Sequence, residues 1–292
     1  MTQLTKRIVV CCSTIFGLIY EKIPFSKFIV EIDLLNPTNT SQFLFVTIDM
    51  ASKKKSKKVP HEVMNESTDN NSESENLYLR QEIARSPMYS TVYLSQDLNE
   101  RDIEYVVEEA VIKKQCRVLQ LTRCKVTSIG AFILANTLNN TENILEELLL
   151  LDNRVGDEGV LHLVKALSTN ENNLKVLDLT QNRISNVGVK YLAEMIQTNE
   201  RLTVLRIAGN EIGNQGIQIL INAIQYHNKT LEELDFCTNR SIDDEVVDCL
   251  IQLIKHSQTL KRLFLFNCNM SPNGKDKLMK TQKKLDNFWL MV

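Results

Sequence analysis

The apolar residues of this chain follow one pattern that recurs about every 28 residues from residue 89 onward. Its core is L-x-x-L-x-L-x-x-N/C, which reads Leu174, Leu177, Leu179 and Asn182 in one copy. The alternation of apolar and other positions predicts a short strand with one buried face. Eight copies are predicted, with their first positions at Tyr89, Cys116, Leu145, Leu174, Leu202, Leu231, Leu260 and Leu285.

A helical half follows each strand. After the copy at Leu174, apolar residues recur at helical spacing (Val189, Leu192, Ala193 and Ile196). Small polar residues suited to an N-cap precede the helices, and in most copies a glycine stands two positions later. These polar residues are Ser128, Asp157, Asn186, Asn214 and Asp243, and the glycines are Gly130, Gly159, Gly188, Gly216 and Gly274. Each unit is therefore predicted to be strand, turn, helix and turn.

A single unit of this length buries too little apolar surface to fold alone, so the units must stack. Stacking places the residues at the N/C position in one column, where a side chain at a strand's end can bond the backbone of adjacent turns. That structural role removes Asn153, Asn182, Asn210 and Asn239 from the candidate exposed site residues.

The pattern resembles the ribonuclease-inhibitor class of leucine-rich repeats over about residues 89–292. Ribonuclease inhibitor, the repeat arrays of NACHT-type immune receptors and the Ran GTPase-activating protein share this repeat class. The resemblance implies an α/β solenoid of about eight repeats with a horseshoe form. Its parallel sheet would line the concave face and its helices the convex face.

The chain before the repeats has a different character, and three segments are predicted. Residues 1–49 include a thirteen-residue apolar run, Ile8 to Tyr20, which is too short to span a bilayer. The run resembles the core of a signal peptide, but the small-x-small cleavage site of a signal peptide does not follow it. Translation starting at Met50 is an alternative. Residues 50–85 form a basic and then polar linker, with "NESTDNNSESEN" expected to be disordered. Residues 86–292 form the repeat domain.

Composition indicates a soluble globular protein and restricts the compartment. The formal net charge of −2 gives no general attraction to nucleic acid or membrane. The seven cysteines are an odd number without a C-x-x-C pair, and one N-x-S/T sequon, at Asn239, falls on a position expected to be buried. We therefore expect an intracellular, cytoplasmic protein rather than a secreted one. The basic run from Lys53 to Lys58 is read as a nuclear import signal, a phosphate-binding patch or a solvated tail.

Catalytic motifs are missing from the sequence. It has no H-E-x-x-H, no G-x-S-x-G and no Walker loop, and the four histidines fall on different repeats or in the linker. We expect no enzyme activity, no cofactor, no metal site and no small-molecule substrate.

The side chains on the open face of the sheet are the candidate binding residues. The middle column of that face is predicted to contain an Asp178, Arg206 and Asp235 charge ladder, and Phe264 is placed beside Trp289. Arg262 and Phe266 flank these aromatic residues, making an apolar patch suited to a binding hot spot. Recognition of a partner, self-association through the C-terminal edge, and collapse of the tail onto the patch are the alternatives. The full set of candidates is Tyr93, Leu149, Asp178, Arg206, Asp235, Arg262, Phe264, Phe266 and Trp289.

The sequence favours a non-enzymatic protein-binding scaffold with a protein partner of unknown identity and no specific nucleic-acid partner. One alternative is a regulator of a small GTPase resembling the Ran activator. Another is a component of cytoskeletal or axonemal assembly.

Overall fold

The computed structural model describes residues 76–138, 144–169, 171–283 and 287–292. Across these ranges eight parallel strands form one sheet, and their order in the sheet follows the chain. The strands are β1 (Thr91–Leu94), β2 (Val118–Leu121), β3 (Glu147–Leu149), β4 (Val176–Asp178), β5 (Val204–Arg206), β6 (Glu233–Asp235), β7 (Arg262–Phe264) and β8 (Trp289–Met291). The repeat pattern therefore predicts seven of these strands correctly, and β8 differs in register.

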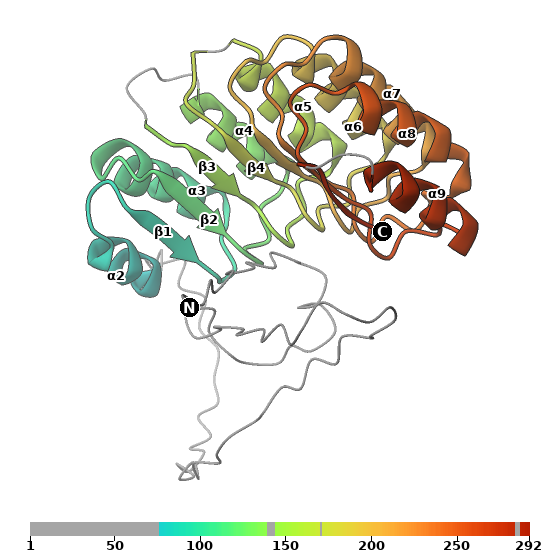
Figure 1. Cartoon of the computed structure of the whole chain (residues 1–292). Coiled ribbons are helices and arrows are strands. Elements are labelled where there is room, and N and C mark those ends of the chain that lie inside the picture. The colour runs from blue at the N-terminus through green and yellow to red at the C-terminus, as the bar shows by residue number, and fades with distance from the viewer. Residues whose placement is uncertain (1–75, 139–143, 170, 284–286) are drawn as a thin grey trace, which may run out of the picture. The chain divides into compact units, whose positions relative to one another are not determined.

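The helices pack along one side of this sheet and leave the other side open (Figure 1). They are α3 (Glu100–Val106) continued by a π-helix (Val107–Lys113), α4 (Ser128–Leu138), α5 (Gly156–Leu167), α6 (Asn186–Ile196), α7 (Asn214–Tyr226), a 3₁₀ turn (Asp244–Val246) leading into α8 (Val247–His256), and α9 (Pro272–Gln282). A further helix, α2 (Leu77–Arg85), lies at the β1 end of the array (Figure 1). The fold is the predicted α/β solenoid.

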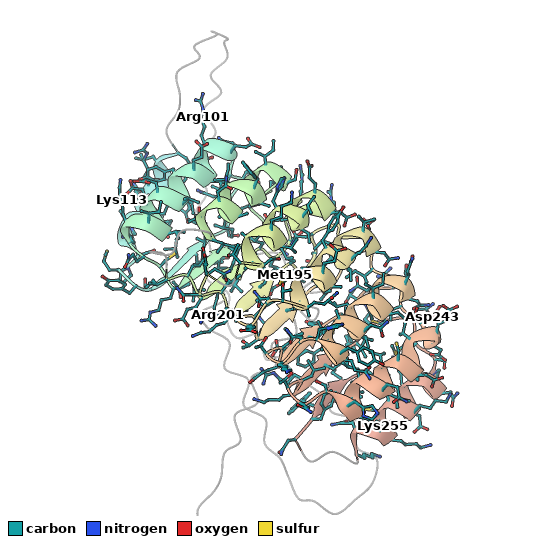
Figure 2. The ribbon with its side chains drawn as sticks, turned by 90° about the horizontal axis from the view of Figure 1, so that it is seen from above. Arg101, Lys113, Met195, Arg201, Asp243 and Lys255 are labelled. Atoms are coloured by element: carbon teal, nitrogen blue, oxygen red, sulfur yellow. The ribbon has the colours of Figure 1, made fainter. Side chains whose placement is uncertain are left out.

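The core lies between the sheet and the helices. The inward leucines of the strands, such as Leu177 and Leu205, are fully buried. On the helical side, Met195 lies within the layer and is 1% exposed, whereas Lys113 and Asp243 lie at its outer margin (Figure 2). Each helix thus presents one apolar stripe to the sheet, as the helical periodicity predicts.

The asparagine column forms the predicted ladder between repeats. Asn182 donates from Nδ2 to the carbonyls of Leu150 (2.7 Å) and Thr180 (3.0 Å), and its Oδ1 accepts from the Val155 amide (3.2 Å). The side chain of Asn210 in turn accepts from the Asn182 amide at 2.9 Å. These side chains satisfy backbone groups that the turns would otherwise leave unpaired in the interior.

Four of the five small polar residues at the helix starts do not cap their helices as predicted. Ser128 lies inside α4, and its hydroxyl donates to Glu158 Oε2 at 2.9 Å. Asp157, Asn186 and Asn214 lie inside the first turns of their helices, and their side chains bond the next repeat instead. The amide of Gly188 donates to Asp157 Oδ1 at 2.9 Å, and the amide of Gly216 donates to Asn186 Oδ1 at 3.2 Å. The N-cap prediction is therefore wrong for these four residues, because contact with a stacked neighbour outweighs the local cap. Asp243 does cap its own turn, accepting from the Glu245 amide.

Residues 77–85 differ from the sequence prediction, which placed them in the linker. They form α2, whose Leu79 and Ile83 are 1% and 2% exposed and belong to the core. The Arg80 guanidinium lies over the Tyr105 ring, 4.6 Å from its centroid. The four-residue spacing of Leu79 and Ile83 places both on one face of the helix, and this face packs against the first repeat.

The last repeat has a different register from the one predicted. Leu290 pairs with Leu263, and Phe264 pairs with Met291. Because Leu290 is therefore the fourth position of the pattern, this copy starts at Asn287, two residues later than predicted. The predicted start, Leu285, lies outside the described residues.

Trp289 consequently lies beside Arg262, not beside Phe264. Side chains in a strand alternate with a period of two, so a shift of two residues keeps the same side chains facing inward. The alternation alone could not fix this register.

Candidate functional site

The open face of the sheet brings most of the predicted site residues into one column. Consecutive strand pairings connect Tyr93 to Gln120, and then to Leu149, Asp178, Arg206, Asp235 and Phe264. Tyr93 is 47% exposed, Leu149, Arg206 and Phe264 are half-buried, and Asp178 and Asp235 are buried. Arg262 and Trp289 lie together in the next column.

The charged part of this face is organised around Glu233, a buried residue that the candidate set did not include. Its Oε1 lies 2.8 Å from Arg206 Nε, and its Oε2 lies 2.6 Å from Arg262 Nε. Arg206 NH1 is 3.8 Å from Asp178 Oδ2, as the predicted ladder requires. One carboxylate therefore holds two guanidinium groups in fixed orientations.

The two buried aspartates bond their own strand ends. Asp178 Oδ1 accepts from the Thr180 amide at 2.9 Å, and Asp235 Oδ1 accepts from the Cys237 amide at 2.8 Å. Burial raises the pKa of Asp178, and the bonds from Thr180 and the charge of Arg206 oppose that rise. Removal from water therefore outweighs the neighbouring donors at this carboxylate.

The aromatic side chains at the β7–β8 end remain accessible to solvent. Phe266 is 43% exposed and Trp289 49%, while the side chain of Arg262, which pairs with Trp289 across the strands, is 40% exposed. Within the described part of the chain these side chains are therefore not covered. An apolar and cationic patch next to a rigid charge network is suited to an interface hot spot.

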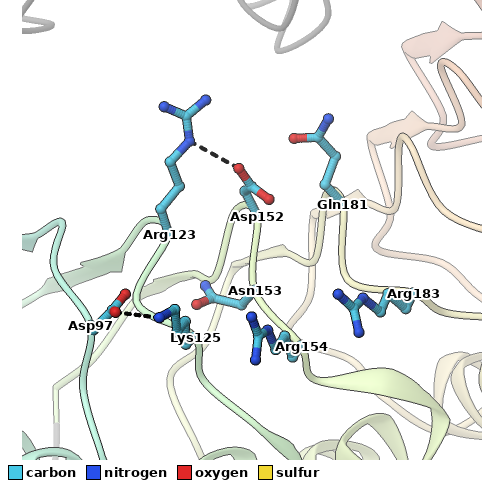
Figure 3. A pocket seen from close by; sticks show the side chains of 8 residues that line it. All are labelled: Asp97, Arg123, Lys125, Asp152, Asn153, Arg154, Gln181 and Arg183. Atoms are coloured by element: carbon cyan, nitrogen blue, oxygen red, sulfur yellow. Dashed lines mark hydrogen bonds and ion pairs between the residues drawn. The ribbon is translucent and has the colours of Figure 1, made fainter. Parts of the chain in front are cut away.

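A second surface feature lies at the strand-to-helix loops of the first four repeats. A pocket of about 320 Å³ opens there, and we call it the loop pocket. Its lining comprises Asp97, Arg123, Lys125, Asp152, Asn153, Arg154, Gln181 and Arg183 (Figure 3). Sequence reasoning did not select these residues. The signal it could have used is the run of basic residues directly after the N/C column, at Lys125, Arg154 and Arg183.

The reactive side chains outside these two features include three buried cysteines and His162. Burial raises the pKa of Cys116 and Cys268 to about 12 and that of Cys124 to about 11, so these thiols stay protonated. His162 packs edge-on against the Phe132 ring, with 5.0 Å between the ring centroids. Residues 76–292, outside the gaps, contain no cluster of three or more metal-binding side chains. In the same ranges, none of the helices has the length and apolar character needed to cross a bilayer.

Comparisons with known proteins give the following matches. The Leucine Rich repeat family model matches residues 170–193 and 198–220. No curated protein matches the chain significantly by sequence.

Solved structures with similar folds have low sequence identity to the chain. The leiomodin-1 actin-binding site 2 structure is 22% identical, with a TM-score of 0.42, covering 51% of this chain and 88% of its own. The tropomodulin C-terminal domain of Caenorhabditis elegans is 16% identical, with a TM-score of 0.42, covering 53% and 92%. An internalin of Listeria monocytogenes is 17% identical, with a TM-score of 0.43, covering 70% and 47%.

The stacked strand-and-helix units, the asparagine ladder and the matching family model agree with one another. They show that the described repeats form a leucine-rich repeat solenoid.

Proposed function

We propose that this protein is a non-enzymatic interaction scaffold that binds a protein partner on the concave face of its sheet. The observation that carries the proposal is the exposure of Phe266 and Trp289 at the β7–β8 end of the face, where Trp289 lies beside Arg262 of the Arg206–Glu233–Arg262 network. Aromatic and arginine side chains are enriched at interface hot spots.

The geometry of the sheet also favours binding over chemistry. The backbone of strands β2 to β7 is fixed by pairing on both sides, and Glu233 fixes the two arginines, so a partner meets a preorganised surface. Such a surface loses little conformational freedom when it binds.

The test is an affinity capture from cell extract with the full chain and two matched variants, read by quantitative mass spectrometry. One variant carries Phe266→Ala and Trp289→Ala. The control carries Phe132→Ala and Tyr226→Ala, which remove aromatic residues that are at least as exposed (46% and 70%) from helices α4 and α7. Partners lost with the first variant and kept with the control support the proposal.

The captured proteins must then be tested with purified components. Loss of two hot-spot residues at about 2 kcal/mol each corresponds to a roughly thousandfold weaker Kd. An Arg206→Ala variant tests the charged half of the face in the same titration. Equal Kd values for all variants would refute binding on the concave face.

The two alternative functions are separated by the identity and behaviour of that partner. A captured small GTPase whose GTP hydrolysis rises on addition of the chain would indicate a GTPase regulator. Co-sedimentation with filaments would indicate an assembly component. Sedimentation velocity of the chain alone tests self-association, since a dimer lost with Trp289→Ala would assign the aromatic patch to contact between copies.

A further inference from the structure

The side chains that line the loop pocket have no role in the proposed binding on the concave face. Its two walls are formed by side chains on either side of the buried N/C column (Figure 3). One wall carries Lys125, Arg154 and Arg183, each directly after a column residue. The other carries Arg123, Asp152 and Gln181, each directly before one. Stacked repeats lie about 5 Å apart, so like charges in one wall are close neighbours.

The pocket has an excess of positive charge. Four cationic side chains and two anionic ones line it, which gives a formal charge of +2, although the whole chain is −2. Asp97 pairs with Lys125, and Asp152 accepts from Arg123 Nε at 2.9 Å. Both carboxylates are therefore already engaged.

Two arginines account for the excess. In the described part of the chain, neither Arg154 nor Arg183 lies within 4.0 Å of a carboxylate. They are exposed and adjacent in the same wall, so they repel each other in the absence of an anion. An oxyanion placed between them would accept from both guanidinium groups and remove that repulsion.

We propose that the loop pocket receives an anionic side chain of the protein partner, a carboxylate or a phosphorylated residue. This inference rests on the proposed scaffold function and assigns the chemistry of a second contact to the same partner. The pocket is open to solvent and lies on the loops, so a side chain can enter it while the partner lies on the repeat array. Guanidinium pairs recognise carboxylate and phosphate groups through bidentate hydrogen bonds.

The chain contains a matched control for this site. Arg240 stands directly after Asn239, at the same repeat position as Arg154 and Arg183, and it is exposed. It lies outside the loop pocket. General attraction of acidic groups to exposed arginine would affect Arg240 as well, whereas specific binding in the loop pocket would leave Arg240 unaffected.

The direct test is NMR of the full chain labelled with ¹⁵N-arginine, observing the Nε–Hε signals. The probes are a tetraglutamate peptide, a peptide with one phosphoserine, a tetraglutamine peptide and inorganic phosphate. Saturable shifts of Arg154 and Arg183 with either anionic peptide, without a shift of Arg240, are expected. Tetraglutamine should produce none, and inorganic phosphate is expected to bind more weakly than the phosphopeptide.

Variants then locate the contact. Arg154→Ala should weaken anionic-peptide binding about tenfold when it is monitored at Arg183, and Arg240→Ala should change it less than about twofold. Failure of both anionic peptides to give a saturable shift overturns the proposal, as does a parallel shift of Arg240. Binding of a single-stranded RNA without binding of either peptide also overturns it.

The concave-face and loop-pocket proposals can fail separately. If the peptides bind the loop pocket while Phe266→Ala and Trp289→Ala leave partner affinity unchanged, the concave-face proposal alone fails. If partner affinity depends on the aromatic residues while Arg154 and Arg183 do not respond to either peptide, the loop-pocket proposal alone fails.

Discussion

The contact between Asp157 and Gly188 allows a sharp test of how neighbouring repeats are held together. Asp157 Oδ1 accepts from the amides of Ser185 (2.8 Å) and Gly188 (2.9 Å), and its Oδ2 accepts from the Ser185 hydroxyl (2.5 Å). A Cβ at position 188 would lie 2.4 Å from Asp157 Oδ1 and 2.7 Å from Ile184 Cγ2. The glycine is therefore needed so that the carboxylate can reach the next helix start.

The expected magnitudes follow from this geometry. Asp157→Ala removes the acceptor of two amides and one hydroxyl in a half-buried site, which should cost about 3 kcal/mol. Gly188→Ala should displace the carboxylate and lose the same bonds, offset by about 1 kcal/mol of helix propensity, for a net cost of about 2 kcal/mol. In the double variant the bonds are lost once and the gain in helix propensity remains, so about 2 kcal/mol is expected instead of a summed 5 kcal/mol.

The assay is equilibrium unfolding in urea followed by far-ultraviolet circular dichroism, with the m-value checked for constancy. Gly213→Ala is the control, because a Cβ there meets no atom closer than 3.5 Å and the backbone is extended. It should cost less than about 1 kcal/mol. Additive costs for Asp157→Ala and Gly188→Ala, within about 0.5 kcal/mol, would refute the coupling and leave Ile184 as the reason for the glycine.

Three further outcomes are expected. Asn182→Ala should lower the free energy of unfolding by about 3 kcal/mol in urea titrations, since it leaves one amide and two carbonyls without their partner; a cost below about 1 kcal/mol would contradict the ladder. The folded-state pKa of Asp178 is raised above 3.8, so the folded state binds a proton more readily than the unfolded state. The stability of the wild type relative to Asp178→Asn should therefore increase as the pH falls from 7 through that raised pKa. A stability difference that does not change with pH would be inconsistent with the raised pKa. In a variant lacking the cysteines at positions 11 and 12, Cys116, Cys124 and Cys268 should react with a thiol reagent at pH 8 only as fast as the chain unfolds. The check is whether urea accelerates the reaction of these thiols in step with unfolding.

The candidate site was predictable where position within the repeat decides exposure. The alternation of the strands placed Tyr93 and Arg206 on the open face, because facing follows directly from a period of two. It could not show that Glu233 holds Arg206 and Arg262, since long side chains on adjacent strands can pair in several ways and packing selects one. Three-dimensional contacts between repeats also decided the loop pocket, whose lining comes from four successive loops.

By itself the sequence determined the repeating unit, the parallel order of the strands and the structural role of the asparagine column. These follow from local periodicity and from the inability of one unit to bury its core. Only the tertiary structure decided the contacts that cross from one repeat to the next. Asp157 bonds the following helix instead of its own, α2 covers the first repeat, and the last repeat is shifted by two residues. In each case the local pattern fits more than one arrangement, and the free energy of packing against a neighbouring unit selects among them.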